Sequence, residues 1–429
     1  MRSLKYNCMQ GIPDSDNLRP LCWRLLLECM PPQKSDWERT LEDQRKTYSD
    51  LLEELIYAKP DSKSAAVAPA SVAEVGRASS DSADDHPLNP NPTSEWSAFF
   101  RDNEVLLQID KDVRRLCPEI SFFQQATQYP RRVSSVYGYS GVAVSNVEPL
   151  SKRVANFMLD SEVLETKRSG ASNLISKRKM AAEEYALLTN ERQEAHWEVV
   201  ERILFIYSKL NTGVKYVQGM NEILGPIYYT LASDTDDRWR RHAEADAYFS
   251  FQSLMAHCKE FFISKLDSST CGIESLMSKL YDQLSELDSE LYRRLVEEQK
   301  LLPQYYAFRW ISLLFSQEFL LPDVIRIWDS LFASDSLFDF LTDFCLAMLL
   351  NAREDLLKND FSANMKLLQN YPPCDVSSLV RQARTITEER EAKALEVKEE
   401  ATENNDVKPT RRIGGFLSNI GSQISAKLK

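Results

Sequence analysis

The chain has 429 residues, of which 43% are hydrophobic and 10% aromatic, enough to bury a large core as one big domain or two lobes with appendages. A net charge of −12 and a pI near 5.1 argue against a general nucleic-acid-binding protein, although a local basic site is compatible with them. With only 12 glycines, the chain is poor in the residue that the turns of an all-β sandwich or barrel need.

The first 92 residues predict a short leader, two helices and a loop. Residues 1–10 form the leader and have no apolar stretch typical of a signal peptide. Residues 11–57 predict two amphipathic helices, the first ended by Pro31-Pro32 and the second beginning at Trp37. Residues 59–92 have low complexity, and we expect them to form a disordered loop.

A further helix is predicted from Ser94 to Leu116, where Pro118 stops it. Its buried stripe follows helical spacing and consists of Val105, Ile109, Val113 and Leu116. Residues 128–180 show no sustained period and are interpreted as a long insertion.

Helical periodicity dominates the second half of the chain, where strand signals are few. The predicted helices span His196–Leu210, Gly219–Leu231, Ala243–Ser264, Gly272–Gln299, Tyr305–Phe315 and Leu337–Leu357. Residues 385–410 are charged and poor in core residues, which predicts a solvated helix or a disordered linker. The fold class is therefore predicted to be all-α, built from many packed helices.

The C-terminal residues 411–429 form an amphipathic pattern. Their apolar side chains fall within about 120° at 100° per residue; they are Ile413, Phe416, Leu417, Ile420, Ile424 and Leu428. We interpret this tail as an interfacial helix that forms on a membrane through Phe416, Leu417, Ile420 and Ile424. A helix that docks onto the protein, or a disordered end, remains an open alternative. No apolar run in the chain is long enough to span a bilayer.

Two short motifs carry the side chains of greatest chemical interest. The first runs from Ile109 to Arg115, and helical spacing places Asp112 and Arg115 on nearly the same face. A carboxylate there can orient the guanidinium, whose planar fork suits phosphate oxygens. On the helix pattern alone, a surface salt bridge is the favoured interpretation. Arg114 points about 100° away and is the weaker candidate.

The second motif runs from Tyr216 to Glu222 and places Gln218 at the entrance of an apolar helix. A carboxamide in that position can orient a water molecule through its oxygen. A capping or turn-stabilising glutamine is the alternative. Gly219 would let another backbone approach closely.

Motifs for self-contained chemistry are missing from the sequence. The four histidines show no paired metal-ligand spacing, and the eight cysteines include no C-x-x-C pair, so no metal site is predicted. No phosphate-binding loop, dinucleotide-binding motif or nucleophile elbow occurs. One arginine and one glutamine without these parts suggest a protein that completes the active site of a partner.

The order of the motifs resembles that of the TBC-domain GTPase-activating proteins that act on Rab GTPases. Gly11-Ile12-Pro13 is similar to the motif that opens this domain, and Ile109, Asp112 and Arg115 fit its I-x-x-D-x-x-R motif. Tyr216, Gln218 and Gly219 fit its Y-x-Q motif, and Arg309-Trp310 and Trp328-Asp329 match later blocks. The resemblance covers most of residues 11–384, interrupted by the loop 59–92 and the insertion 128–180, and implies a two-lobed, all-α TBC domain.

The resemblance also implies a mechanism in trans on a GTP-bound Rab protein. Arg115 would neutralise charge on the transferring phosphoryl group, Gln218 would position the attacking water, and Asp112 would hold Arg115. The chain would need no cofactor of its own, because GTP and magnesium belong to the partner. A cytoplasmic protein, peripheral on endomembranes and active in vesicle trafficking, is expected, with no nucleic-acid partner. A non-catalytic adaptor that binds a GTPase or a membrane is the alternative.

Overall fold

The computed structural model describes residues 1–14, 17–57, 95–131, 150, 153–154, 194–262 and 272–406. These ranges contain helices and one isolated β-bridge but no strand, so the predicted all-α fold is confirmed for them. The predicted loop 59–92, nearly all of the insertion 128–180, and the tail 411–429 lie outside the described residues. None of the helices in the described ranges is long and apolar enough to cross a membrane.

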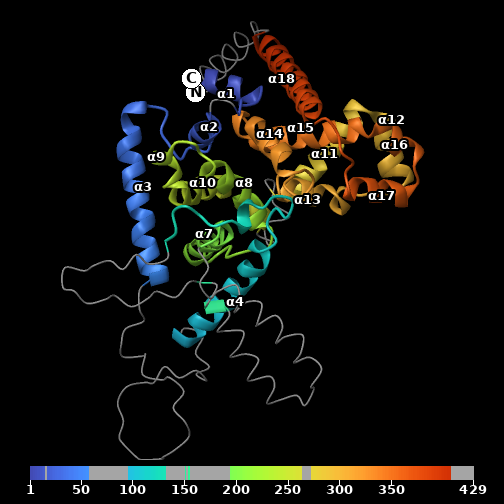
Figure 1. The fold of residues 1–429 in the computed structure, drawn as a ribbon. Helices are drawn as coiled ribbons and strands as arrows, with labels where there is room; N and C mark the ends of the chain where they lie inside the picture. The colour runs from blue at the N-terminus through green and yellow to red at the C-terminus, as the bar shows by residue number, and fades with distance from the viewer. Residues whose placement is uncertain are drawn as a thin grey trace, which may run out of the picture.

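The N-terminal half forms one group of helices, of which the first, α1 (Arg2–Met9), packs mainly against α14 (Leu321–Ala333) of the C-terminal half (Figure 1). Its α-helices are α1 (Arg2–Met9), α2 (Arg19–Leu26), α3 (Trp37–Leu52), α4 (Glu95–Val113), α7 (His196–Leu210), α8 (Met220–Ala232), α9 (Asp237–Arg240) and α10 (Ala243–Cys258). Short 3-10 turns lie at η1 (Lys34–Asp36), η3 (Phe122–Gln124) and η4 (Lys259–Phe262), and a π-helical turn, η2 (Glu53–Tyr57), extends α3. In this group α10 packs against α3, α7 and α8, and α4 packs against α7.

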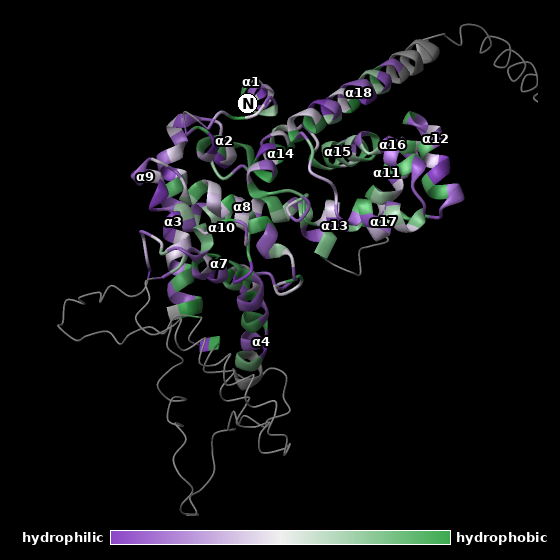
Figure 2. Cartoon of the chain, turned by 45° about the vertical axis from the view of Figure 1, so that its right-hand side comes forward, coloured by the Kyte–Doolittle hydropathy of each residue, from purple (hydrophilic) through white to green (hydrophobic). Residues whose placement is uncertain are grey.

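The C-terminal half forms a second group beside the first (Figure 1). Its α-helices are α11 (Ile273–Leu287), α12 (Ser289–Tyr292), α13 (Ala307–Ser312), α14 (Leu321–Ala333), α15 (Leu337–Asn351), α16 (Arg353–Lys358), α17 (Phe361–Gln369) and α18 (Val376–Asp406). A π-helical turn, η6 (Arg293–Glu298), and a 3-10 turn, η7 (Pro303–Tyr305), connect them. The largely hydrophobic α15 packs against α11 and α18, and the outer part of α18 is largely hydrophilic (Figure 2).

The hydrophobic periodicity of the sequence predicted where the long helices lie, but several of them begin or end at residues other than those predicted. The helix predicted for His196–Leu210 is α7 with the same bounds. The single helix predicted for Gly272–Gln299 is instead divided, because Asp288 leaves the helical conformation at φ −146° and accepts a hydrogen bond from Leu291 N at 3.0 Å. The helix α18 runs without a break through the predicted domain boundary at residue 384 as far as Asp406.

A buried carboxylate ties the N-terminal segment to α14. Asp329 accepts hydrogen bonds from Ile12 N at 3.1 Å, Arg19 Nε at 3.0 Å and Trp23 Nε1 at 2.8 Å. Its side chain is fully buried, so these donors are needed to stabilise the charge. The motif that opens the domain is thereby held against the Trp328-Asp329 block, and both Trp310 and Trp328 are fully buried.

The chain closes a bridge at the base of the predicted insertion. Thr127 N donates to Glu194 O at 2.8 Å, and His196 N donates to Gln125 O at 3.0 Å. An antiparallel β-bridge joins Ala126 and Ala195 between these two bonds. The two segments that flank residues 132–193 are therefore adjacent to each other at the edge of the helical core.

Candidate functional site

The arginine motif lies where α4 gives way to a tight turn. The backbone N–H groups of Arg115 and Leu116 bond three residues back, to Asp112 O at 3.2 Å and Val113 O at 3.2 Å. Cys117 then adopts a left-handed conformation with φ 43°, and Pro118 cannot continue the helix. Arg115 is thus carried by the turn rather than by the helix that was predicted to include it.

The two neighbouring arginines have different environments. The Arg114 guanidinium pairs with the fully buried carboxylate of Asp110 at 2.9 Å and lies 4.2 Å from the ring centroid of Trp197. Arg115 is exposed, and its Nε donates to Lys111 O at 3.1 Å. The fork of Arg115 therefore faces solvent, whereas that of Arg114 is used within the fold, as the helical offset between them indicated.

The glutamine motif surrounds the start of α8. Tyr216 is buried and Gln218 is exposed. Gly219 caps α8 with φ 102°, a conformation that favours glycine. A Cβ atom on Gly219 would lie 2.6 Å from Leu313 Cδ2, so the close approach expected at this glycine is to the segment after α13.

A hydrogen-bond network joins the two motifs. The Tyr216 hydroxyl donates to Asp112 Oδ2 at 2.8 Å and lies 3.3 Å from Asn221 Oδ1, while Asn221 Nδ2 lies 3.5 Å from Asp112 O. Burial, reinforced by the Asp112 charge, raises the pKa of Tyr216 far above its usual range, so the hydroxyl remains a donor. We expected Asp112 to hold Arg115; the structure directs its carboxylate to Tyr216 instead.

Two residues of the network escaped sequence reasoning. Asn221 is buried, and its Nδ2 also donates to Glu222 Oε1 at 3.0 Å. Burial raises the pKa of Glu222 to about 7, helped by the carboxylates of Glu119 and Asp112 and opposed by the hydrogen bond from Asn221. The signal available in the sequence was a polar pair in the first turn of an otherwise apolar helix.

Apolar side chains pack the arginine turn against the core. Three residues of the predicted stripe, Ile109, Val113 and Leu116, are buried, whereas the fourth, Val105, is half-buried. A Cβ atom on Gly225 of α8 would lie 2.9 Å from Leu116 Cδ1, so α8 receives the residue that follows Arg115. The helix α8 therefore begins at the glutamine motif and also contacts the arginine turn, through Gly225 and Leu116.

The arrangement presents two exposed polar groups on a fixed base. A solvent-facing guanidinium can pair with anionic oxygens through two parallel hydrogen bonds, and a solvent-facing carboxamide can accept from and donate to a water molecule. The described residues hold no group of three or more His, Cys, Asp or Glu side chains arranged to bind a metal ion. The tail residues Phe416, Leu417, Ile420 and Ile424 lie outside the described part of the chain.

Comparison with known proteins gives the same family on three grounds. The sequence profile of the Rab-GTPase-TBC domain matches residues 175–357. The chain is 49% identical over 395 residues to TBC1 domain family member 13 of Homo sapiens, covering 91% of this chain and 94% of that protein. It is 34% identical over 432 residues to TBC domain-containing protein C1952.17c of Schizosaccharomyces pombe, covering 87% of this chain and 68% of that protein.

A solved structure shares the fold at lower sequence identity. The crystal structure of the Ypt/Rab-GAP domain of Gyp1p superposes with a TM-score of 0.56 at 19% identity. The match covers 89% of this chain and 91% of that domain. The helical architecture of the described residues is therefore one already seen in a solved domain.

Proposed function

The chain belongs to the Rab-GTPase-TBC domain family, and from this premise we propose that it stimulates GTP hydrolysis by a Rab-family GTPase through Arg115 and Gln218. The observation that carries the proposal is the Tyr216–Asp112 hydrogen bond of 2.8 Å. This bond joins the segment that carries the exposed Arg115 to the segment that carries the exposed Gln218. Each of these two side chains lies within three residues of the bond.

Arg115 supplies positive charge in this mechanism. The Rab protein holds GTP and Mg²⁺, and charge spreads over the transferring phosphoryl oxygens in the transition state. The Arg115 fork donates two charge-assisted hydrogen bonds to those oxygens, which a point charge would not reproduce. An arginine supplied in trans contributes about 10³- to 10⁵-fold in rate.

Gln218 acts on the nucleophile. Its carboxamide oxygen accepts a hydrogen bond from the attacking water, and its nitrogen donates to a backbone oxygen of the partner. Gly219 lets the chain turn directly behind Gln218, so the side chain projects from the start of α8. Asp112, Tyr216 and Asn221 are positioning residues, because they act through the segments that carry Arg115 and Gln218.

GTP hydrolysis by a panel of purified Rab proteins tests the proposal. Wild type should accelerate hydrolysis by one or a few of them, and Arg115→Ala and Gln218→Ala should each lose nearly all of the stimulation. Arg39→Ala removes an arginine from α3 whose side chain is 90% exposed, and it should behave as wild type. The Arg115→Ala variant should still bind the GTP-loaded substrate, because the finger acts mainly in the transition state.

The alternative is an adaptor that binds a GTPase or a membrane without catalysis. Wild type that binds a GTP-loaded Rab protein but accelerates none of the panel would favour this function. Full stimulation by Arg115→Ala would instead leave the activity in place and remove Arg115 from the mechanism.

We further propose that the protein is cytoplasmic and peripheral on endomembranes, with residues 411–429 as its membrane contact. The support is the apolar sector formed in the sequence by Phe416, Leu417, Ile420 and Ile424. Vesicle flotation with the full chain and with a chain ending at residue 410 tests this. Equal flotation of the two proteins would rule the tail out as the contact.

A further inference from the structure

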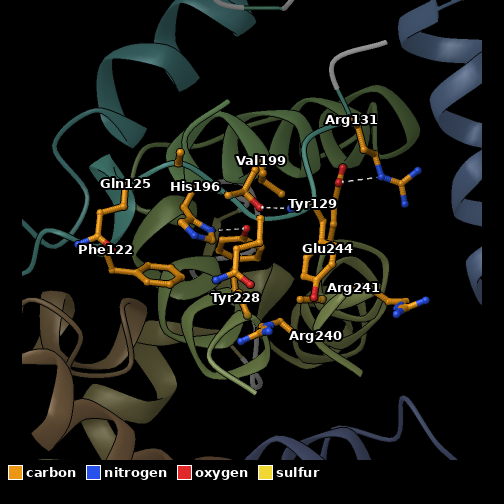
Figure 3. Close-up of a pocket in the computed structure, with 15 residues that line it drawn as sticks. Phe122, Gln125, Tyr129, Arg131, His196, Val199, Tyr228, Arg240, Arg241 and Glu244 are labelled. Atoms are coloured by element: carbon orange, nitrogen blue, oxygen red, sulfur yellow. Dashed lines mark hydrogen bonds and ion pairs between the residues drawn. The ribbon is translucent and has the colours of Figure 1, made fainter. Parts of the chain in front are cut away.

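A cavity of about 160 Å³ lies apart from Arg115 and Gln218, between the segment 122–131 and the ends of four helices. The first turn of α7, the end of α8, the end of α9 and the start of α10 contribute its walls. In Figure 3 Phe122 lies on the left, Arg131 and Arg241 on the right, and Arg240 below the centre, near Tyr228. Its volume equals that of about five water molecules, which is enough for one small anionic group.

The charged side chains of the wall are mostly positive. Three arginines, Arg131, Arg240 and Arg241, line the cavity together with one carboxylate, Glu244 (Figure 3). Glu244 is already compensated, because Arg202 Nε donates to its Oε1 at 2.7 Å and Arg131 Nε pairs with its Oε2 at 3.0 Å. Arg202 is itself shared with Glu194.

The remaining two guanidiniums share one surface carboxylate. Asp237 lies 3.1 Å from Arg240 Nη2 and 2.8 Å from Arg241 Nη2, and its side chain is 53% exposed. Such exposed pairs are weak, so the carboxylate competes little with a bound anion. Arg240 Nε is buried and has no hydrogen-bond acceptor among the described residues. A buried donor of this kind favours an added acceptor.

Neutral aromatic side chains complete the opposite wall. Phe122 stacks on His196 with ring centroids 4.1 Å apart, and His196 Nδ1 lies 2.7 Å from the Tyr228 hydroxyl. Burial lowers the pKa of His196 to about 4, so the imidazole carries no charge at neutral pH. The positive charge of the cavity therefore comes from the arginines.

We propose that this cavity binds the phosphate group of a small molecule or of a lipid headgroup. The wall has three guanidiniums and one carboxylate, and the further carboxylate of Asp237, which pairs with Arg240 and Arg241, is half exposed. A phosphate monoester carries close to two negative charges at neutral pH. A carboxylate ligand carries only one negative charge and would therefore neutralise less of the positive charge of the arginines than a phosphate group. Guanidinium forks from two separate segments also suit the several oxygens of a phosphate group.

Calorimetric titration of the full chain with inorganic phosphate tests the site, with sodium chloride added to keep the ionic strength constant. Wild type should bind phosphate saturably and acetate much more weakly. Arg240→Met and Arg241→Met should each weaken phosphate binding about tenfold or more. Arg241 is 51% exposed, so its variant tests the site even if Arg240→Met is unstable.

Arg238→Met is the matched control. Arg238 belongs to the same short helix and its side chain is 84% exposed, but it pairs with Asp236 and does not line the cavity. This variant should keep the wild-type affinity. Absence of saturable phosphate binding, an equal loss in Arg238→Met, or equal affinity for acetate would overturn the proposal.

Vesicle pelleting distinguishes the source of the phosphate. Binding to phosphatidylcholine vesicles that contain phosphatidic acid, lost in Arg241→Met and kept in Arg238→Met, assigns the site to a lipid headgroup. Saturable binding of inorganic phosphate without such pelleting assigns it to a soluble phosphate monoester.

Discussion

The Tyr216 hydroxyl donates a 2.8 Å hydrogen bond to Oδ2 of Asp112, a residue 104 positions earlier in the chain. Asp112 precedes Arg115 by three residues, and Tyr216 precedes Gln218 by two. One partly buried hydrogen bond therefore joins the two segments that carry the side chains required by the proposed reaction.

Removing this bond should reduce stimulation while both exposed side chains remain. For Tyr216→Phe we expect a loss of about 1–3 kcal/mol of stability, because Asp112 loses a partly buried donor. Stimulated GTP hydrolysis should fall about tenfold or more, since misplacement of reacting groups by a fraction of an ångström is costly. Tyr6→Phe, at a side chain that is 67% exposed, is the control. Unchanged single-turnover rates in Tyr216→Phe would contradict the positioning role.

The two adjacent arginines should differ in their effect on stability. Arg114→Ala removes the ion pair with the buried Asp110 carboxylate and the contact with the Trp197 ring, and it should lower the free energy of unfolding by about 3–5 kcal/mol. Arg115→Ala removes an exposed side chain and should change it by about 0.5 kcal/mol or less. Urea denaturation followed by circular dichroism measures both. A larger loss in Arg115→Ala than in Arg114→Ala would reverse the assignment.

Two glycines near the glutamine motif provide a matched pair. Gly219→Ala forces a side chain into φ 102° and against Leu313, so we expect a loss of about 1–3 kcal/mol. A Cβ atom on Gly213 meets nothing within 4 Å, and Gly213→Ala should leave stability nearly unchanged. Thermal unfolding of the two variants checks this. Similar melting temperatures of the two variants would mean that Leu313 moves aside, and that the backbone at position 219 accepts a side chain, without loss of stability.

Glu222 should make stability depend on pH. Its pKa of about 7 in the folded protein exceeds the ordinary value of 4.5 that it regains on unfolding. The folded state therefore binds the proton more tightly, and the contribution of Glu222 is complete below pH 4.5 and lost as pH rises through 7. Near pH 8 the charged side chain should cost about 3 kcal/mol.

Glu222→Gln removes this dependence. The variant should be more stable than wild type above pH 7, and the difference between them should shrink as pH falls toward 5. Denaturant unfolding at several pH values measures it, with Glu38→Gln on the exposed side of α3 as the control. A constant difference between Glu222→Gln and wild type across this range would contradict the raised pKa.

Helical periodicity predicted the fold better than it predicted the boundaries of its elements. The helix α7 is amphipathic enough to have been located with its correct bounds, whereas the short α13 was predicted to run from Tyr305 to Phe315 and spans only Ala307–Ser312. Leu314 and Phe315, with φ 50° and 66°, cannot extend that helix, and their conformation depends on packing that one segment does not reveal.

The site was partly accessible to sequence reasoning. The 100° offset between successive helical residues set Arg114 apart from Arg115 as the weaker candidate. In the structure the half-buried Arg114 pairs with Asp110, and Arg115 is exposed. The partner of Asp112 could not be found in this way, because i,i+3 spacing suggested Arg115 and the observed donor, Tyr216, belongs to a distant segment. A hydrogen bond between residues far apart in the chain produces no periodic pattern in the sequence, so periodicity cannot predict it.

The bridge between Ala126 and Ala195 has a consequence for the evolution and engineering of this protein. Residues 131 and 194 are held together by a hydrogen bond from Arg131 N to Glu194 Oε2 at 2.6 Å. Between them, Leu150 and Val154 are buried in the core, and Arg153 Nε donates to Asn103 Oδ1 of α4 at 2.7 Å, so this short part of the stretch belongs to the packed domain. The entropy of closing a flexible loop grows only slowly, by about 0.6 kcal/mol for each doubling of its length. The chain on either side of residues 150–154 is therefore suited to accept a foreign domain, such as a fluorescent reporter, whereas replacing all of 132–193 by a simple linker would remove core contacts.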